Sequence, residues 1–293
     1  MRPVSGSANA KLDPLIQIRD LIYKTAGIFQ ADNKLQILDD RCRRRMKALG
    51  VPTLRDYYGC LTVNSMRQAE MVSLLNEITV GETYFFRNLP QLDAIRKIVL
   101  PAIIEAKSKL GQTRLRIWSA GCSTGEEPFT LSMMLLEESR GELKGWTTEI
   151  LATDLNERSI AYAKAGSYGE YSTRTIEPAF LNKYFRVNGD RLEVKSEVKS
   201  SVVFSRLNLL DDSRMIFAQN IDLILCCNVL IYFDTASKKR VIQHFYRTLL
   251  AHGYLFLGHS ESLYGVNEDF RLVHMPSSTA YVKSESPEIS ALR

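Results

Sequence analysis

The chain has 293 residues, of which 45% are hydrophobic and 24% charged, and this composition is that of a globular protein of about two domains rather than a disordered or fibrous chain. Its net charge of +5 is too small to predict nucleic-acid binding. The longest apolar run, 221–233, is too short to cross a bilayer as a helix, and the first ten residues lack the apolar region of a signal peptide, so we expect a soluble cytoplasmic protein without membrane insertion.

Residues 12 to about 80 carry helical signals and almost no strand signals. In the segment 33–49, apolar residues recur at steps of three and four, and Gly50 and Pro52 mark its end. Further helices are expected after Thr53 and Ser65, because each is a good N-cap residue. We therefore predict an all-α N-terminal domain over residues 1–82.

The helix expected at 33–49 carries a dense group of basic residues, RCRRRMK at 41–47. A rotation of about 100° per residue places Arg41 and Arg45 together with Lys34 beside the apolar stripe, and Arg44 lies nearby. Such a face often only keeps a helix soluble, but the planar fork of arginine suits carboxylates. We expect a docking surface for an acidic partner, formed by Lys34, Arg41, Arg44 and Arg45.

A linker and a helix from about Pro90 to Lys109 are expected within 83–113, and the pattern then changes. Short apolar runs alternate with helical stretches at 115–120, 148–154, 202–208, 221–227 and 254–259. Alternating strands and helices predict a mostly parallel sheet covered on both faces. We expect a Rossmann-like, doubly wound α/β domain over 114–283. The five cysteines fall in apolar patterns without metal-site spacing, so buried thiols and no metal are expected.

Two parts of this α/β domain depart from the alternating pattern. FRLVH at 270–274 and TAYVK at 279–283 predict a closing antiparallel hairpin, and residues 284–293 form a tail. The dipeptide Asn188-Gly189 predicts a hairpin turn inside a small β-subdomain inserted at about 172–203.

The segment SAGCSTGEEP at 119–128 fits two patterns. It contains G-x-S-x-G around Ser123, the nucleophile elbow of serine hydrolases, and its glycines also suit a cofactor loop. An elbow follows several strands, whereas this segment follows the first one, and neither His259 nor Asp234 has a spacing that supports a triad. The position after the first strand favours the cofactor loop.

Acidic residues refine the cofactor interpretation. Asp154 ends the second predicted strand, where a carboxylate binds ribose hydroxyls. Glu126 and Glu127 would repel a pyrophosphate, although such residues also commonly stabilise the start of a helix. A cofactor without phosphate and with a positive charge fits better, and S-adenosylmethionine has both properties.

Six motifs together resemble the chemotaxis-receptor glutamate methyltransferases of the CheR type. They are TYFFR at 83–87, SAGCSTGEEP at 119–128, ATDLN at 152–156, NLLD at 208–211, NVLIYFD at 228–234 and GHSESL at 258–263. The resemblance implies transfer of a methyl group from S-adenosylmethionine to receptor glutamates, giving methyl esters and S-adenosylhomocysteine. It implies as partner the helical cytoplasmic domain of chemoreceptors. A non-receptor acceptor and a non-catalytic S-adenosylmethionine sensor are the alternatives.

The same motifs imply roles for individual residues. The cofactor would be bound by Thr83, Arg87, Gly121, Glu126, Asp154, Asn208, Leu209 and Asn228, and the methyl-transfer site would contain Arg87 and Tyr232. Gly81 and Cys227 stand where the family often has Asn and Arg. Some members of this family bind a pentapeptide at the receptor's C-terminal tail through a glycine-rich extension of the β-subdomain. The hairpin segment 186–195 is short and has a single glycine, so we expect an enzyme that does not depend on this pentapeptide. We also expect a monomer.

Overall fold

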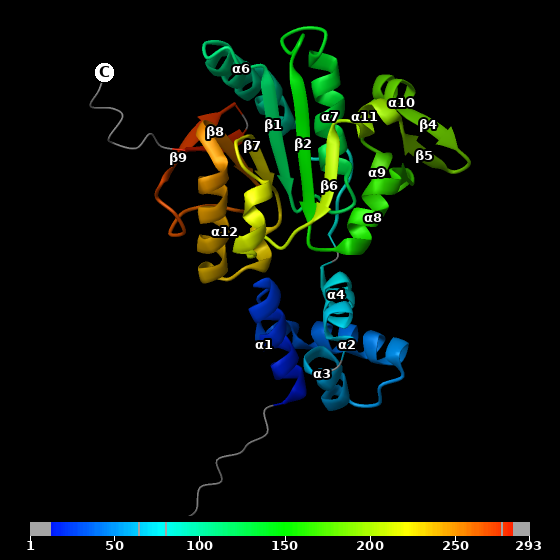
Figure 1. The fold of residues 1–293 in the computed structure, drawn as a ribbon. Helices are drawn as coiled ribbons and strands as arrows, with labels where there is room; N and C mark the ends of the chain where they lie inside the picture. Colours follow the sequence, from blue (N-terminus) through cyan, green and yellow to red (C-terminus); the bar gives the residue numbers. More distant parts are fainter. Residues whose placement is uncertain (1–12, 64, 80, 277, 284–293) are drawn as a thin grey trace, which may run out of the picture. The chain divides into compact units, whose positions relative to one another are not determined.

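The computed structural model describes residues 13–63, 65–79, 81–276 and 278–283 (Figure 1). The expected tail at 284–293 and the first twelve residues lie outside these ranges. The chain forms two compact units, Met1–Ile78 and Thr79–Arg293. Each unit is described by itself.

The N-terminal unit is built from helices, as predicted. They are α1 (Pro14–Ala26), the short η1 (Asp32–Lys34), α2 (Leu35–Leu49), α3 (Leu54–Thr62) and α4 (Arg67–Ile78). Thr53 caps α3 by accepting a hydrogen bond from the Asp56 N–H, and Gly50 ends α2 in the left-handed conformation. The helices bury apolar side chains on their inner faces, including Ile18, Ile22, Leu38, Cys42, Tyr57, Leu61 and Leu74.

The larger unit contains a seven-stranded sheet of order β6-β2-β1-β7-β8-β10-β9 (Figure 1). The parallel strands are β6 (Val202–Arg206), β2 (Thr147–Asp154), β1 (Arg114–Ala120), β7 (Ile221–Cys226) and β8 (Leu249–Leu257). The antiparallel hairpin of β9 (Phe270–Met275) and β10 (Ser278–Lys283) joins the sheet through β8. The doubly wound sheet and its closing hairpin are confirmed.

Helices cover both faces of this sheet (Figure 1). One face packs against α5 (Leu89–Ala94), the π-helical η2 (Ile95–Val99), α6 (Leu100–Ser108) and α7 (Glu126–Glu138); the other packs against η3 (Asp212–Phe217) and α12 (Thr235–Thr248). Neighbouring residues of β1 point to opposite faces, because side chains alternate along a strand. Ile117 lies in the same cluster as Phe129 of α7, whereas the Trp118 ring packs edge-on against Phe245 of α12.

A three-stranded sheet of order β3-β5-β4 is inserted between β2 and β6 (Figure 1). Its strands are β3 (Ser167–Tyr168), β4 (Phe185–Asn188) and β5 (Arg191–Val194), and the helices around it are α8 (Glu157–Ala165), α9 (Glu170–Thr173), α10 (Pro178–Tyr184) and α11 (Ser196–Lys199). The hairpin that Asn188-Gly189 predicts is present, but its turn is formed by Gly189 and Asp190, because Asn188 pairs with Arg191. The strand β3 lies before residue 172, where the β-subdomain was expected to start. The sequence did not reveal this strand, because two residues are too few to give a strand pattern.

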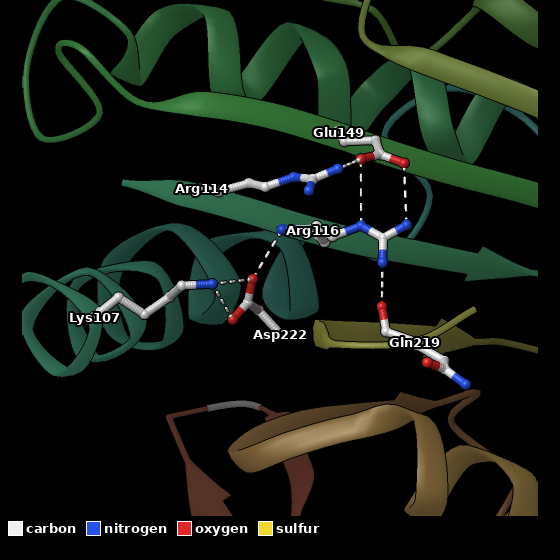
Figure 2. A network of polar contacts seen from close by, with 6 residues as sticks. All are labelled: Lys107, Arg114, Arg116, Glu149, Gln219 and Asp222. Carbon is white, nitrogen blue, oxygen red and sulfur yellow. Dashed lines mark hydrogen bonds and ion pairs between the residues drawn. The ribbon is translucent and has the colours of Figure 1, made fainter. Parts of the chain in front are cut away.

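Charged residues link the amino ends of the central strands (Figure 2). Lys107 of α6 donates hydrogen bonds to both carboxylate oxygens of Asp222 on β7, at 2.8 and 2.9 Å, and both side chains are largely buried. Asp222 also accepts from the Arg116 N–H at 2.8 Å, and the Arg116 side chain pairs with Glu149 on β2. These contacts fix one end of the sheet, and the loops of the opposite, carboxyl end are where an α/β fold binds ligands.

Candidate functional site

The carboxyl ends of β1, β2 and β6 are held together by main-chain hydrogen bonds. The N–H groups of Gly121 and Cys122 donate to the Thr153 carbonyl oxygen at 2.7 and 2.9 Å. The Leu207 N–H donates to the Asp154 carbonyl oxygen at 2.9 Å. The structure thus brings the glycine loop, the end of the second strand and the NLLD segment to one edge of the sheet.

Asp154 lies at the centre of this edge. Its Oδ2 accepts a hydrogen bond from the Ser123 N–H and its Oδ1 accepts one from the Asn156 N–H, both at 2.8 Å. Burial raises the pKa of Asp154, although these main-chain donors oppose the shift. The carboxylate is therefore fixed in orientation between the glycine loop and α8, as the sugar-binding acid of such a fold requires.

The serine-hydrolase interpretation finds no support in this geometry. Ser123 offers its main-chain N–H to Asp154, and its own φ of 48° belongs to a tight left-handed turn. Asp234, the acid considered for a triad, caps α12 by accepting from the Ser237 N–H at 2.8 Å. Ser123 thus shapes the loop.

Two positions of the loop require glycine, because a different neighbouring side chain lies close to each of them. Gly121 has a φ of 85°, and a Cβ there would overlap Cγ2 of Val229 from the NVLIYFD segment. Gly125 has a φ of 95°, and its Cβ would lie 2.7 Å from that of Ala163 on α8. The loop therefore packs tightly against two neighbouring segments, and any larger residue would displace one of them.

Glu126 and Glu127 begin α7 but have different surroundings. Glu126 is only 1% exposed, and its carboxylate accepts hydrogen bonds from Thr124 Oγ1 at 2.7 Å and Ser172 Oγ at 2.9 Å. Glu127 accepts from Ser119 Oγ at 2.7 Å, at the end of β1. Burial raises the pKa of both glutamates above the ordinary value.

Glu127 has polar neighbours from other segments of the chain. Hydrogen bonds from Ser119 and Cys227 and the positive charge of Arg87 oppose the rise in the pKa of Glu127, so these groups lie around it. Glu126, in contrast, faces the β-subdomain through Ser172. Both glutamates thus lie buried at the start of α7, and the cofactor role of Glu126 stays a prediction.

The TYFFR segment at 83–87 is anchored on both sides. Phe85 is fully buried, and its ring packs edge-on against Tyr168 of the β-subdomain with centroids 4.9 Å apart. The Phe86 N–H donates to Thr130 Oγ1 of α7 at 3.1 Å. The segment thus joins α7 to the β-subdomain through residues that were not predicted as site residues.

Thr83 and Arg87 flank these anchors. Arg87 is exposed, and its Nη1 donates to the Glu82 carbonyl oxygen at 2.7 Å, whereas Thr83 is half-buried. A Cβ at Gly81 would lie 3.2 Å from Ser123 Oγ, so the main chain before Thr83 runs along the glycine loop. A main-chain contact at Gly81 does not depend on a side chain at this position.

The segment NVLIYFD follows β7 at the same edge. Asn228 is half-buried with a left-handed φ of 62°, and Tyr232 lies in the short helix η4 (Leu230–Tyr232). The Tyr232 hydroxyl has no hydrogen-bond partner among the residues that the structure describes, so it is available to a ligand. Cys227, in place of the family's arginine, donates from its thiol to Gln91 Oε1 at 3.4 Å.

Asn208 and Leu209 form the loop after β6. Asn208 Oδ1 accepts from the Leu210 N–H at 3.1 Å, which closes a tight turn. Leu209 is buried, and its carbonyl oxygen lies 3.0 Å from Nδ1 of His244 on α12. The turn holds an apolar side chain at the sheet edge, where a flat apolar ring can pack against it.

The predicted basic face on α2 needs one correction. Lys34 and Arg44 are exposed and Arg41 is half-buried, but Arg45 donates two hydrogen bonds to the buried carboxylate of Glu70, at 2.9 and 2.7 Å. Tyr57 also donates to Glu70, at 2.7 Å. Arg45 is therefore part of the interior of the helical unit and is not free for docking.

Two family models match the chain. The model described as CheR methyltransferase, all-alpha domain, covers residues 14–79, and the CheR methyltransferase, SAM binding domain, covers residues 81–279. The chain belongs to the CheR methyltransferase family. It is accordingly an S-adenosylmethionine-dependent methyltransferase, as the sequence motifs predict.

Curated relatives agree with this assignment. Chemotaxis protein methyltransferase 1 of Pseudomonas aeruginosa is 35% identical over 94% of this chain and 98% of that protein. Chemotaxis protein methyltransferase 2 of Vibrio cholerae is 33% identical, with 91% of each chain covered. Among solved structures, magnesium protoporphyrin IX methyltransferase from Synechocystis with bound S-adenosylmethionine matches with a TM-score of 0.35 and 17% identity, covering 94% of this chain and 100% of that one.

The residues at the sheet edge fit S-adenosylmethionine. The fixed carboxylate of Asp154 suits ribose hydroxyls, and the glycine loop offers main chain without a crowding side chain. Glu127 adds a negative charge that suits a cationic ligand and disfavours a phosphate. None of the helices within the described residues is long and apolar enough to cross a membrane.

Proposed function

We propose that this CheR-family enzyme methylates glutamate side chains in the cytoplasmic helical domain of chemoreceptors and forms glutamyl methyl esters. The proposal rests on the chemotaxis methyltransferases among its relatives and on one structural observation. Asp154 at the end of β2, the glycine loop and the NVLIYFD segment meet at one edge of the sheet. We place the enzyme in the cytoplasm, where these receptor domains lie.

The cofactor would be held by residues that the structure has already fixed in place. Asp154 would bind the ribose hydroxyls, and Asn208 and Leu209 would frame the adenine. Glu126 and Glu127 would face the positively charged end, with Thr83, Arg87, Asn228 and the main chain of Gly121 completing the site. When bound, S-adenosylmethionine supplies an activated methyl group on a sulfonium, which is a good leaving group.

The acceptor carboxylate needs no general base, because glutamate is ionised near neutral pH. The enzyme has to align this carboxylate and exclude water, which makes the transfer effectively unimolecular. Arg87 is exposed and positively charged, and it orients the acceptor. The free hydroxyl of Tyr232 donates a hydrogen bond to it. A tight Arg87 ion pair would lower the nucleophilicity of the acceptor, so the role of Arg87 is orientation more than neutralisation.

Receptor docking is assigned to the rest of the basic face, the exposed Lys34 and Arg44 and the half-buried Arg41. Methylated receptor segments are acidic, so these side chains attract them electrostatically. The turn between β4 and β5 contains only Gly189 and Asp190, which supports the proposal that no pentapeptide tether is used.

Kinetics with a receptor cytoplasmic fragment test these assignments. Tyr232→Phe should lower kcat while the affinity for S-adenosylhomocysteine stays near wild type. Asp154→Ala should weaken that affinity by at least about tenfold, since a hydrogen bond to a charged group contributes about 1.5–3 kcal/mol. Wild-type kcat in Tyr232→Phe would remove this residue from the methyl-transfer site. Tight cofactor binding without methyl transfer by the native enzyme would indicate a sensor.

A further inference from the structure

Glu261 follows β8 and lies beside the loop that carries Asn228 and Tyr232. Its Oε2 accepts hydrogen bonds from the Asn228 N–H at 2.7 Å and from the Gly258 N–H at 2.8 Å. Its Oε1 accepts from the Ile231 N–H at 3.2 Å. One carboxylate therefore connects the ends of β7 and β8 through three main-chain donors.

The loop that donates two of these hydrogen bonds contains a strained backbone conformation. Asn228 has a φ of 62°, a region that residues with a Cβ seldom occupy. Its N–H needs an acceptor, and a charged acceptor forms a stronger bond than a neutral one. Glu261 supplies that acceptor and so favours the left-handed turn after Cys227. The same carboxylate holds Ile231 inside η4, the helix that ends at Tyr232.

Gly258 provides the space for this contact. A Cβ at Gly258 would lie 2.6 Å from Glu261 Oε2 and 2.8 Å from the Asn228 nitrogen. Its φ is not in the left-handed region, so the need for glycine is spatial. Gly258 and Glu261 both belong to the motif GHSESL, and this contact explains why the motif contains both residues.

We propose that Glu261 is a positioning residue for methyl transfer. Its carboxylate fixes Asn228 beneath the cofactor and, through Ile231, sets the place of the Tyr232 side chain. Both oxygens of Glu261 are engaged by main-chain N–H groups, so it acts through these residues and does not touch the substrate. The inference rests on the proposed roles of Asn228 and Tyr232.

A double-mutant cycle tests this proposal with the full-length enzyme and a receptor cytoplasmic fragment. Glu261→Gln keeps the shape of the side chain but replaces one acceptor oxygen by an amide donor. It should lower kcat by about 10- to 100-fold, as expected for hydrogen bonds to a charged group. In the Tyr232→Phe background the same change should lower kcat less than about threefold, because the two residues act together.

Two further variants separate positioning from a general loss of structure. Gly258→Ala leaves every charge in place and displaces the Glu261 carboxylate, so it should reproduce the loss of kcat. Glu268→Gln changes an exposed glutamate of the same segment and should leave kcat unchanged. Thermal unfolding of each variant shows whether it is folded at the assay temperature.

The outcomes distinguish this inference from the proposed function. Unchanged kcat in Glu261→Gln and Gly258→Ala, or a full multiplicative loss in the Tyr232→Phe background, would overturn the positioning role. A native enzyme that transfers no methyl group to the receptor fragment would instead overturn the proposed function.

Discussion

Gly121→Ala tests whether the glycine loop and the NVLIYFD segment form one cofactor site. Gly121 has a φ of 85°, and a Cβ there would overlap Cγ2 and lie 3.4 Å from Cβ of Val229. Gly145 gives a matched control, because its φ is 82° and a Cβ there would have no neighbour within 4 Å. The two substitutions therefore share the backbone strain and differ in the contact with Val229.

The expected losses of stability follow from the backbone strain and from the contact with Val229. Left-handed strain costs about 1–2 kcal/mol, and this is the whole effect expected for Gly145→Ala. Overpacking against Val229 adds about 1–3 kcal/mol for Gly121→Ala. Urea unfolding should show this difference between the two variants. Val229→Ala should restore part of the stability of Gly121→Ala, because it removes the Cγ2 atom that the new methyl group overlaps.

Cofactor binding provides the second readout. Displacement of Val229 moves the neighbouring Asn228, so the affinity of Gly121→Ala for S-adenosylhomocysteine should fall at least about tenfold, which corresponds to about 1.4 kcal/mol. Gly145→Ala should bind as the native enzyme does. Equal stability and equal affinity of the two alanine variants would refute the close packing of these segments as the basis of the site.

Three further predictions concern charged residues. Asp222→Asn should lower the free energy of unfolding by about 3–5 kcal/mol in urea titrations, since it leaves Lys107 buried without its partner; a loss below about 1 kcal/mol would contradict the buried ion pair. Burial raises the pKa of Glu127 and Glu126 in the folded enzyme. The pKa of a glutamate in the unfolded chain is about 4.3, so each buried glutamate lowers the free energy of unfolding once the pH rises above that value. Glu127→Gln and Glu126→Gln should both gain stability relative to the native enzyme as the pH rises above that value. Each change should also weaken the affinity for S-adenosylhomocysteine, and an unchanged affinity in calorimetry would remove that glutamate from the cofactor site. Arg44→Glu should slow receptor methylation and reduce its salt dependence with stability changed by no more than about 0.5 kcal/mol, and an unchanged rate at low salt would remove Arg44 from the docking surface.

The fold could be predicted because its signals are local. Each central strand is a short apolar run, and the carboxyl ends of parallel strands meet at one edge, so the place of Asp154 followed from the order of strands and helices alone. The two-residue strand β3 gave no such pattern. The strand β3 is held by residues of β5 that lie at least 24 positions later in the chain. One of them is Arg191, whose Nε donates to Ser167 Oγ.

The orientation of individual side chains could not be predicted with the same success. Consecutive helix residues point about 100° apart, so the sequence did not distinguish which of Glu126 and Glu127 faces the end of β1. Arg45 lies beside the apolar stripe of its helix, where either solvent or a neighbouring helix can meet it. Its partner Glu70 is 25 residues away on α4, and no single-helix pattern reveals that contact.

Alkali treatment of receptor-bearing membranes labelled from methyl-labelled S-adenosylmethionine tests the proposed reaction most directly. Glutamyl methyl esters hydrolyse in alkali, so the label should appear as methanol, and it should be absent when the enzyme carries Asp154→Ala at a cofactor concentration well below saturation. Label that stays on protein after alkali would contradict carboxylate methylation, and label on proteins other than the receptors would contradict the proposed acceptor.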